Sequence, residues 1–190
     1  FRQMTKLAAN LSMMFTEVDF LDRFEAAAKA GFKGVEYLFP YDFPADEIKE
    51  KLEQNNLTQV LFDFPAGDWA AGDRGCASFP DRVGEFQDGV GKAVEYAKVL
   101  GCDRLTVLAG KATSGVSAMK MQETLIDNMK FASSAVAGTG IIILLEAINI
   151  IDIPGYSVFR TNQSRAAVEA TGANNVKVQY DIYHMQIMEG

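Results

Sequence analysis

Two acidic residues and the single histidine of this chain stand where runs of apolar residues end. Glu146 closes the run 141–146, and Asp181 and His184 follow the run 176–180. Carboxylate oxygens are ligands that Mg²⁺ and Mn²⁺ prefer. An imidazole near neutral pH can serve as hydrogen-bond donor or as acid. The three residues therefore suggest metal-assisted proton transfer on a small substrate.

Structural roles remain open for the same residues. An acid at the end of a strand can simply cap the next helix or pair with a lysine or arginine, and a lone histidine is more often structural than catalytic. Further polar candidates are Asn10, which lies near the end of the first apolar run, and Asn149, which follows Glu146. Asp68 and Trp69 lie in a long glycine-rich loop, and such loops often carry function. The tryptophan could wall off a pocket from water or only anchor its loop.

Short apolar runs alternate along the chain with longer segments of helical spacing, which is typical of parallel βα units. Such units build either an open doubly wound sheet or a closed eight-stranded barrel. The barrel is favoured because polar residues stand near the ends of several runs, and because no glycine-rich dinucleotide motif follows the first run. We predict strands at 7–15, 34–39, 59–64, 104–110, 141–146 and 176–180, with five helices between them, the last beginning near Thr161 or Ser164.

Composition narrows the classes of function. The chain has 190 residues, of which 48% are hydrophobic, enough for a single domain spanning 1–190. A net charge of −7 disfavours nucleic acid as a partner, since phosphate binding needs clustered lysine and arginine. No apolar run is long enough to cross a membrane. Two distant cysteines indicate a reducing compartment, so we expect a cytoplasmic protein.

Several long segments of the sequence resemble the hydroxypyruvate isomerase family, which belongs to the xylose-isomerase-like TIM barrels. They are 8–15 (AANLSMMF), 34–41 (GVEYLFPY), 65–69 (PAGDW) and 180–186 (YDIYHMQ). The resemblance covers essentially the whole chain. It implies a TIM (β/α)8-type barrel that binds a divalent metal, Mg²⁺ or Mn²⁺.

The resemblance also implies a role for individual residues. Glu146 matches a glutamate that touches the metal and acts as acid or base, and Asp181 matches a second metal ligand. His184 matches a histidine that contacts substrate oxygen, and we count Asn149, Asp68, Trp69 and Asn10 as substrate-binding candidates. The implied reaction interconverts hydroxypyruvate and tartronate semialdehyde through an enediolate that the metal stabilises. A small hydroxy- or oxo-acid is its substrate, and no redox cofactor is required.

Two residues after the fifth predicted strand depart from the family pattern. Where the family commonly has proline and arginine, this chain has Ala147 and Ile151. If that arginine binds the substrate carboxylate, a different acid is recognised here. The dipeptide Glu-Ala at the start of this segment also occurs in relatives that act on four-carbon oxo-acids. A 2-oxo-tetronate isomerase therefore stays an alternative, as does a ketose 3-epimerase of the same superfamily.

The length also departs from the family. A TIM barrel typically has about 250 residues, whereas this chain offers about six βα units. We therefore expect an incomplete barrel unless sequence is missing, with its C-terminal part, a further metal ligand and a second catalytic glutamate absent. Unpaired edge strands would favour association, for example as a homo-oligomer. A non-catalytic remnant that binds a small acid or a partner is the third hypothesis.

Overall fold

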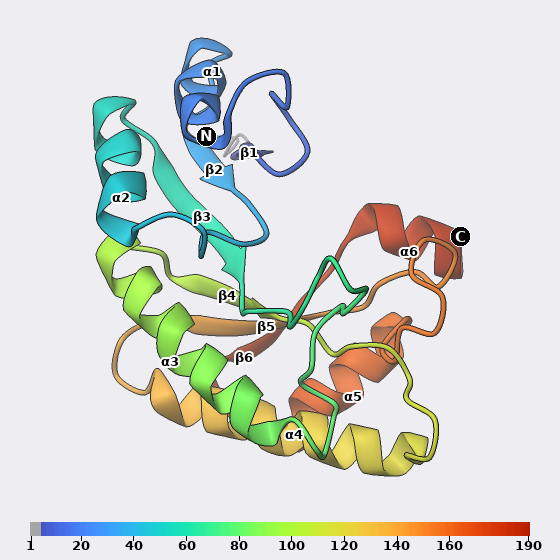
Figure 1. Cartoon of the computed structure of the whole chain (residues 1–190). Coiled ribbons are helices and arrows are strands. Elements are labelled where there is room, and N and C mark those ends of the chain that lie inside the picture. Colours follow the sequence, from blue (N-terminus) through green and yellow to red (C-terminus); the bar gives the residue numbers. More distant parts are fainter. Residues whose placement is uncertain (1–4) are drawn as a thin grey trace. The chain divides into compact units, whose positions relative to one another are not determined.

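The computed structural model describes residues 5–190, in which strands and helices alternate along the chain (Figure 1). The six strands form a sheet in the order β1-β2-β3-β4-β5-β6, the same as their order in the sequence, and the pairs β1–β2, β2–β3 and β5–β6 are parallel. This order has no reversal, in contrast to a doubly wound sheet. The strands are β1 (Ala8–Asn10), β2 (Gly34–Glu36), β3 (Thr58–Asp63), β4 (Arg104–Val107), β5 (Ile142–Glu146) and β6 (Val176–Gln179).

The helices between the strands follow the spacing of apolar residues predicted from the sequence. Each helix with a clear apolar stripe buries that stripe, as Ile48 and Leu52 do in α2. The helices are η1 (Phe20–Asp22), α1 (Arg23–Lys29), α2 (Ala45–Gln54), α3 (Val83–Leu100), α4 (Ala118–Ala135), α5 (Thr161–Thr171) and α6 (Ile182–Glu189). None of the helices within residues 5–190 is both long enough and apolar enough to cross a membrane.

The chain forms two compact units, of which the first contains the residues up to Phe62 together with Glu95–Arg104. Its core is aromatic. Tyr37, which is 2% exposed, contacts the rings of Phe20 and Phe24 from the α1 region and the ring of Phe62 from β3. Offset and edge-on aromatic contacts of this kind stabilise a core beyond the area they bury. They fix the loop that follows β2.

The second unit contains Asp63–Val94 and Leu105–Gly190. β5 and β6 pair in register from Ile143↔Val176 to Glu146↔Gln179. Helices α4 and α5 lie side by side, and α5 also contacts β5 and β6 (Figure 1). The Ser164 hydroxyl on α5 donates to the backbone oxygen of Leu145 at 2.8 Å, and both residues are fully buried. This hydrogen bond ties α5 to the end of the strand that carries Glu146.

The strands predicted at 34–39 and 104–110 each end three residues earlier, at Glu36 and Val107, and two other segments differ more. The first strand ends at Asn10 rather than at Phe15, because the Asn10 side chain accepts the amide of Ser12 and its carbonyl accepts the amide of Met14, which turns the chain. The helix α6 was not predicted. Its residues are apolar on several sides, with Ile182 75% exposed and Met185 buried, so no single apolar stripe marks it in the sequence.

The two cysteines are free and buried. Burial raises the pKa of the Cys76 thiol to about 11 and that of Cys102 to about 12. A thiolate nucleophile needs the opposite shift in pKa. Neither cysteine is therefore suited to catalysis.

Candidate active site at the ends of β5 and β6

Glu146 is the last residue of β5 and lies directly opposite Gln179 of β6. Residues paired in this way point to the same side of the sheet. The Gln179 side-chain nitrogen donates to Glu146 Oε1 at 3.1 Å, and its side-chain oxygen accepts the hydroxyl of Thr106 at 2.7 Å. The amide of Gln179 is thus held from both sides, and it orients the carboxylate of Glu146, which is only 8% exposed.

Asp181 connects β6 to α6 and caps the helix. Its Oδ1 accepts the backbone amide of His184 at 3.2 Å. A carboxylate in this position satisfies an unpaired N–H group and is stabilised by the helix dipole. The capping role considered from the sequence is therefore present. It leaves Asp181 Oδ2 directed towards the imidazole, 3.9 Å from His184 Nε2.

Glu146, Asp181 and His184 form one cluster. One possible ligand atom from each residue lies within 4.8 Å of those of the other two. Oxygen ligands stand about 2.0–2.6 Å from Mg²⁺ or Ca²⁺, so atoms this far apart can share one cation. Two carboxylates suit a hard divalent ion better than a soft one. A divalent metal held by this cluster stays a prediction.

Asn149, in the loop after β5, contacts His184 of this cluster and is fully buried. Its Oδ1 accepts the backbone amides of Ile151 and Asp152 at 3.0 and 2.8 Å. Its Nδ2 lies 2.9 Å from Asp152 Oδ2 and 2.8 Å from His184 Nδ1. Protein groups therefore engage both polar atoms of Asn149, and the residue links the β5 loop to the ring of His184.

Asp152 is the outer member of the same network. The hydrogen bond from Asn149, followed by one from the Tyr183 hydroxyl at 2.7 Å, holds the pKa of Asp152 below its usual range. The hydrogen bond between Tyr183 and Asp152 also raises the pKa of Tyr183. Asp152 is thus kept as a carboxylate, and its charge helps to hold Asn149 in place.

The remaining sequence candidates have local partners. In the first unit, Asn10 Nδ2 donates to Glu36 Oε1 at 3.1 Å, which joins the ends of β1 and β2. In the second unit, Asp68 accepts the amide of Ala71 at 2.9 Å and so closes a turn in the loop. The Arg74 guanidinium stacks 4.0 Å from the centre of the Trp69 ring. A direct role of these residues with substrate stays a prediction.

Two residues of the site, Gln179 and Thr106, were not picked out from the sequence. The alternation of side chains along a strand offers a signal for Gln179, because it stands two residues before Asp181. No comparable signal points to Thr106. Its bond to Gln179 joins residues 73 positions apart.

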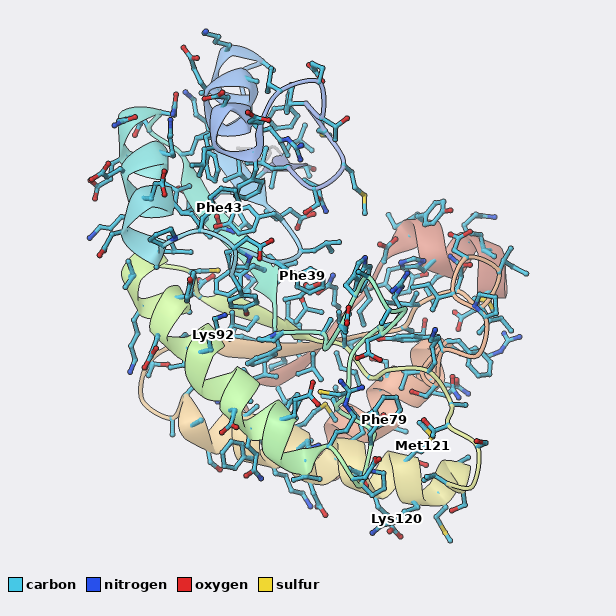
Figure 2. The ribbon with its side chains drawn as sticks, viewed as in Figure 1. Phe39, Phe43, Phe79, Lys92, Lys120 and Met121 are labelled. Carbon is cyan, nitrogen blue, oxygen red and sulfur yellow. The ribbon has the colours of Figure 1, made fainter. Side chains whose placement is uncertain are left out.

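A separate cavity of about 720 Å³ lies beside α4 and α5. Met121, which is labelled on α4 in Figure 2, lines it together with Leu125, Tyr156 and Phe159. Glu146, Asp181 and His184 are not among its lining residues. The cavity is therefore distinct from the acidic cluster.

Comparison with known proteins identifies relatives of the whole chain. A family model described as xylose isomerase-like TIM barrel matches residues 24–190. The chain is 47% identical over 187 residues to hydroxypyruvate isomerase of Escherichia coli (strain K12) and also 47% identical over 187 residues to 2-oxo-tetronate isomerase of Cupriavidus necator. Each alignment covers 98% of this chain and 72% of the relative.

Solved structures share the fold of this chain. A crystal structure named AP endonuclease, family 2, from Brucella melitensis matches with a TM-score of 0.96 and 48% identity, over 98% of this chain and 72% of that one. A D-psicose 3-epimerase from Clostridium cellulolyticum H10 matches with a TM-score of 0.75 and 19% identity, over 97% of this chain and 66% of that one. The second match shows a shared fold alone.

Proposed function

The chain belongs to the xylose isomerase-like TIM barrel family and is an isomerase, and on this premise we propose that it interconverts hydroxypyruvate and tartronate semialdehyde. The fold and family predicted from the sequence are confirmed. One observation carries the proposed reaction: Glu146, Asp181 and His184 converge at the ends of β5 and β6 in a chain 47% identical to a hydroxypyruvate isomerase.

In this proposal Glu146 moves the proton. Its carboxylate takes a proton from the hydroxymethyl carbon of hydroxypyruvate and returns it to the neighbouring carbonyl carbon, while the hydroxyl proton passes from one oxygen to the other. Gln179 orients the carboxylate for both steps. Because Glu146 is 8% exposed, little water competes for the proton.

His184 and Asp181 complete the proposed site. His184 donates a hydrogen bond to a substrate oxygen, which stabilises the negative charge that develops there. Glu146 and Asp181 would hold a divalent cation, Mg²⁺ or Mn²⁺, which would supply Lewis-acid stabilisation of the same charge. The separation of the ligand atoms and the hard oxygen donors support this assignment.

A 2-oxo-tetronate isomerase is the second candidate, because the chain is 47% identical to an enzyme of that name as well. The two substrates share a 2-oxo-acid and differ by one hydroxylated carbon. Ile151 is 71% exposed and stands two residues after Asn149, where an apolar side chain offers no charge to a substrate carboxylate. Because both acids carry a carboxylate, it is the 47% identity and not Ile151 that supports the second candidate.

The name of the Brucella structure raises endonuclease action as another function, but the charges of this chain disfavour it. The chain has 18 lysines and arginines against 25 aspartates and glutamates. Binding to DNA phosphates depends on clustered positive charge. Nuclease action on nucleic acid is therefore not proposed.

The decisive experiment measures turnover of hydroxypyruvate and of 2-oxo-tetronate by the purified protein, before and after chelation and on return of Mg²⁺ or Mn²⁺. We expect turnover to be lost on chelation and restored by metal. Glu146→Gln should lower kcat by about 100-fold or more, the usual contribution of a general acid or base. Full activity in this variant, or activity that survives chelation, would refute the mechanism.

The same assay decides between the two acids. Ile151→Arg is the informative variant, since it places a positive charge at the position where the hydroxypyruvate isomerase family commonly has arginine. We expect it to lower KM for hydroxypyruvate. An unchanged KM would show that position 151 takes no part in recognising the acid.

A further inference from the structure

We propose that Asn149 is a positioning residue that sets the tautomer of His184, so that the neutral imidazole carries its proton on Nε2. Asn149 was expected from the sequence to bind substrate, yet it is fully buried and its polar atoms face protein groups. The use of the Nε2 proton on a substrate oxygen rests on the proposed isomerase function. The tautomer itself does not.

The orientation of the Asn149 amide is fixed by the backbone. Oδ1 lies 3.0 Å from the amide nitrogen of Ile151 and 2.8 Å from that of Asp152. Both of these groups are donors, so the atom that faces them must be the oxygen. Turning the amide over would place its NH₂ against two N–H groups in a buried position. The side-chain nitrogen is therefore directed to the opposite side.

The side-chain nitrogen in turn determines the state of the histidine ring. Nδ2 carries two hydrogens and accepts none. One hydrogen is directed to Asp152 Oδ2 at 2.9 Å and the other to His184 Nδ1 at 2.8 Å. A proton on Nδ1 would therefore face another N–H. In the neutral ring Nδ1 must be the acceptor, and the proton resides on Nε2.

The proton on Nε2 remains available to a substrate. Nε2 lies 3.9 Å from Asp181 Oδ2, which is beyond hydrogen-bonding distance. A metal ligand would need a lone pair on Nε2 and hence a proton on Nδ1, which Asn149 opposes. Of the three residues in the cluster, the two carboxylates are thus left for a cation and His184 for a substrate oxygen.

Nitrogen NMR of the ring tests this proposal directly, because His184 is the only histidine in the chain. The protein is labelled with ¹⁵N-histidine, and the ring nitrogens are observed at alkaline pH, where an imidazole is neutral. We expect Nδ1 to resonate as an unprotonated nitrogen and Nε2 as a protonated one. A protonated Nδ1 in the wild-type protein would overturn the proposal.

Asn149→Asp provides the matched perturbation. The second carboxylate oxygen replaces Nδ2, so an acceptor instead of a donor faces the ring, while the two backbone amides keep their acceptor. We expect the proton to move to Nδ1. The control is Tyr183→Phe, which removes the hydrogen bond to Asp152 but not the Asn149–His184 contact, and should leave the proton on Nε2. An Asn149→Asp protein whose proton stays on Nε2 would contradict the proposal.

Turnover separates this proposal from the proposed function. Asn149→Asp should lower kcat more than it raises KM, because the lost donor acts on charge that develops during the reaction. If the tautomers are as expected but neither acid is turned over by the wild type, the isomerase proposal fails and the role of Asn149 stands. If turnover is normal but Nδ1 carries the proton, the role of Asn149 is refuted and the isomerase proposal stands. Should Asn149→Asp not fold, the wild-type spectrum still decides.

Discussion

Replacing Gln179 with leucine should weaken both the fold and the site, because the side-chain amide of Gln179 on β6 is hydrogen-bonded to β4 and to the candidate catalytic glutamate on β5. The side chain accepts the Thr106 hydroxyl at 2.7 Å and donates to Glu146 at 3.1 Å. Leucine has a similar volume but can form neither bond. The substitution therefore removes polar contacts while leaving most of the packing intact.

The size of the effect follows from the burial of the partners. A hydrogen bond to a charged group contributes roughly 1.5–3 kcal/mol, and a buried hydroxyl left unpaired costs about 1–3 kcal/mol. Thr106 is 0% exposed, so water cannot replace its partner. Gln179 itself is only partly buried, which reduces the first contribution. We expect Gln179→Leu to lower the free energy of unfolding by about 2–4 kcal/mol.

Urea unfolding of the purified protein measures this change, with Thr106→Val and the double variant completing a thermodynamic cycle. Thr106→Val removes the hydroxyl that Gln179→Leu would leave without a partner. The loss of unfolding free energy in the double variant should therefore be smaller than the sum of the two single losses by about 1 kcal/mol. A Gln179→Leu protein as stable as the wild type, or strictly additive effects, would refute the hydrogen-bonded arrangement of β4, β5 and β6.

Two further predictions concern the loop before α3. Gly75→Ala should destabilise by about 2–4 kcal/mol in urea, because φ is +100° and the new Cβ would overlap a backbone carbonyl just after β4. The control is Gly115→Ala in the loop before α4, where φ is +82° and the space is open, so the loss should be only about 1 kcal/mol. Equal losses in the two variants would contradict the packing argument. The Arg82 guanidinium holds the pKa values of Asp73 and Glu85 below their ordinary 3.8 and 4.5. A carboxyl group whose pKa is lower in the folded than in the unfolded protein stabilises the fold above its unfolded pKa, and this stabilisation is lost as the pH falls through its folded pKa. Arg82→Gln should therefore make the loss of stability below about pH 4.5 less steep. Since these groups are partly exposed, the change at neutral pH should stay below about 1 kcal/mol, and an acid profile identical to the wild type would exclude the effect.

The alternating elements were accessible from the sequence for a physical reason. Parallel strands buried on both faces need continuous apolar runs, and 141–146 is such a run. Helix α3 repeats its apolar residues every three or four positions, which places Phe86, Val90 and Ala97 on one buried face. The long motifs identified the family, and Glu146, Asp181 and His184 stood out because each follows an apolar run.

What the sequence alone determined is therefore the order of the elements, the family and the three residues of the cluster. The tertiary structure decided how these residues are held: Gln179 against Glu146, Thr106 against Gln179, and Asn149 against His184. These contacts join residues 33, 73 and 35 positions apart. They depend on the register of neighbouring strands and on the path of the loop after β5, and both are set by packing across the whole unit.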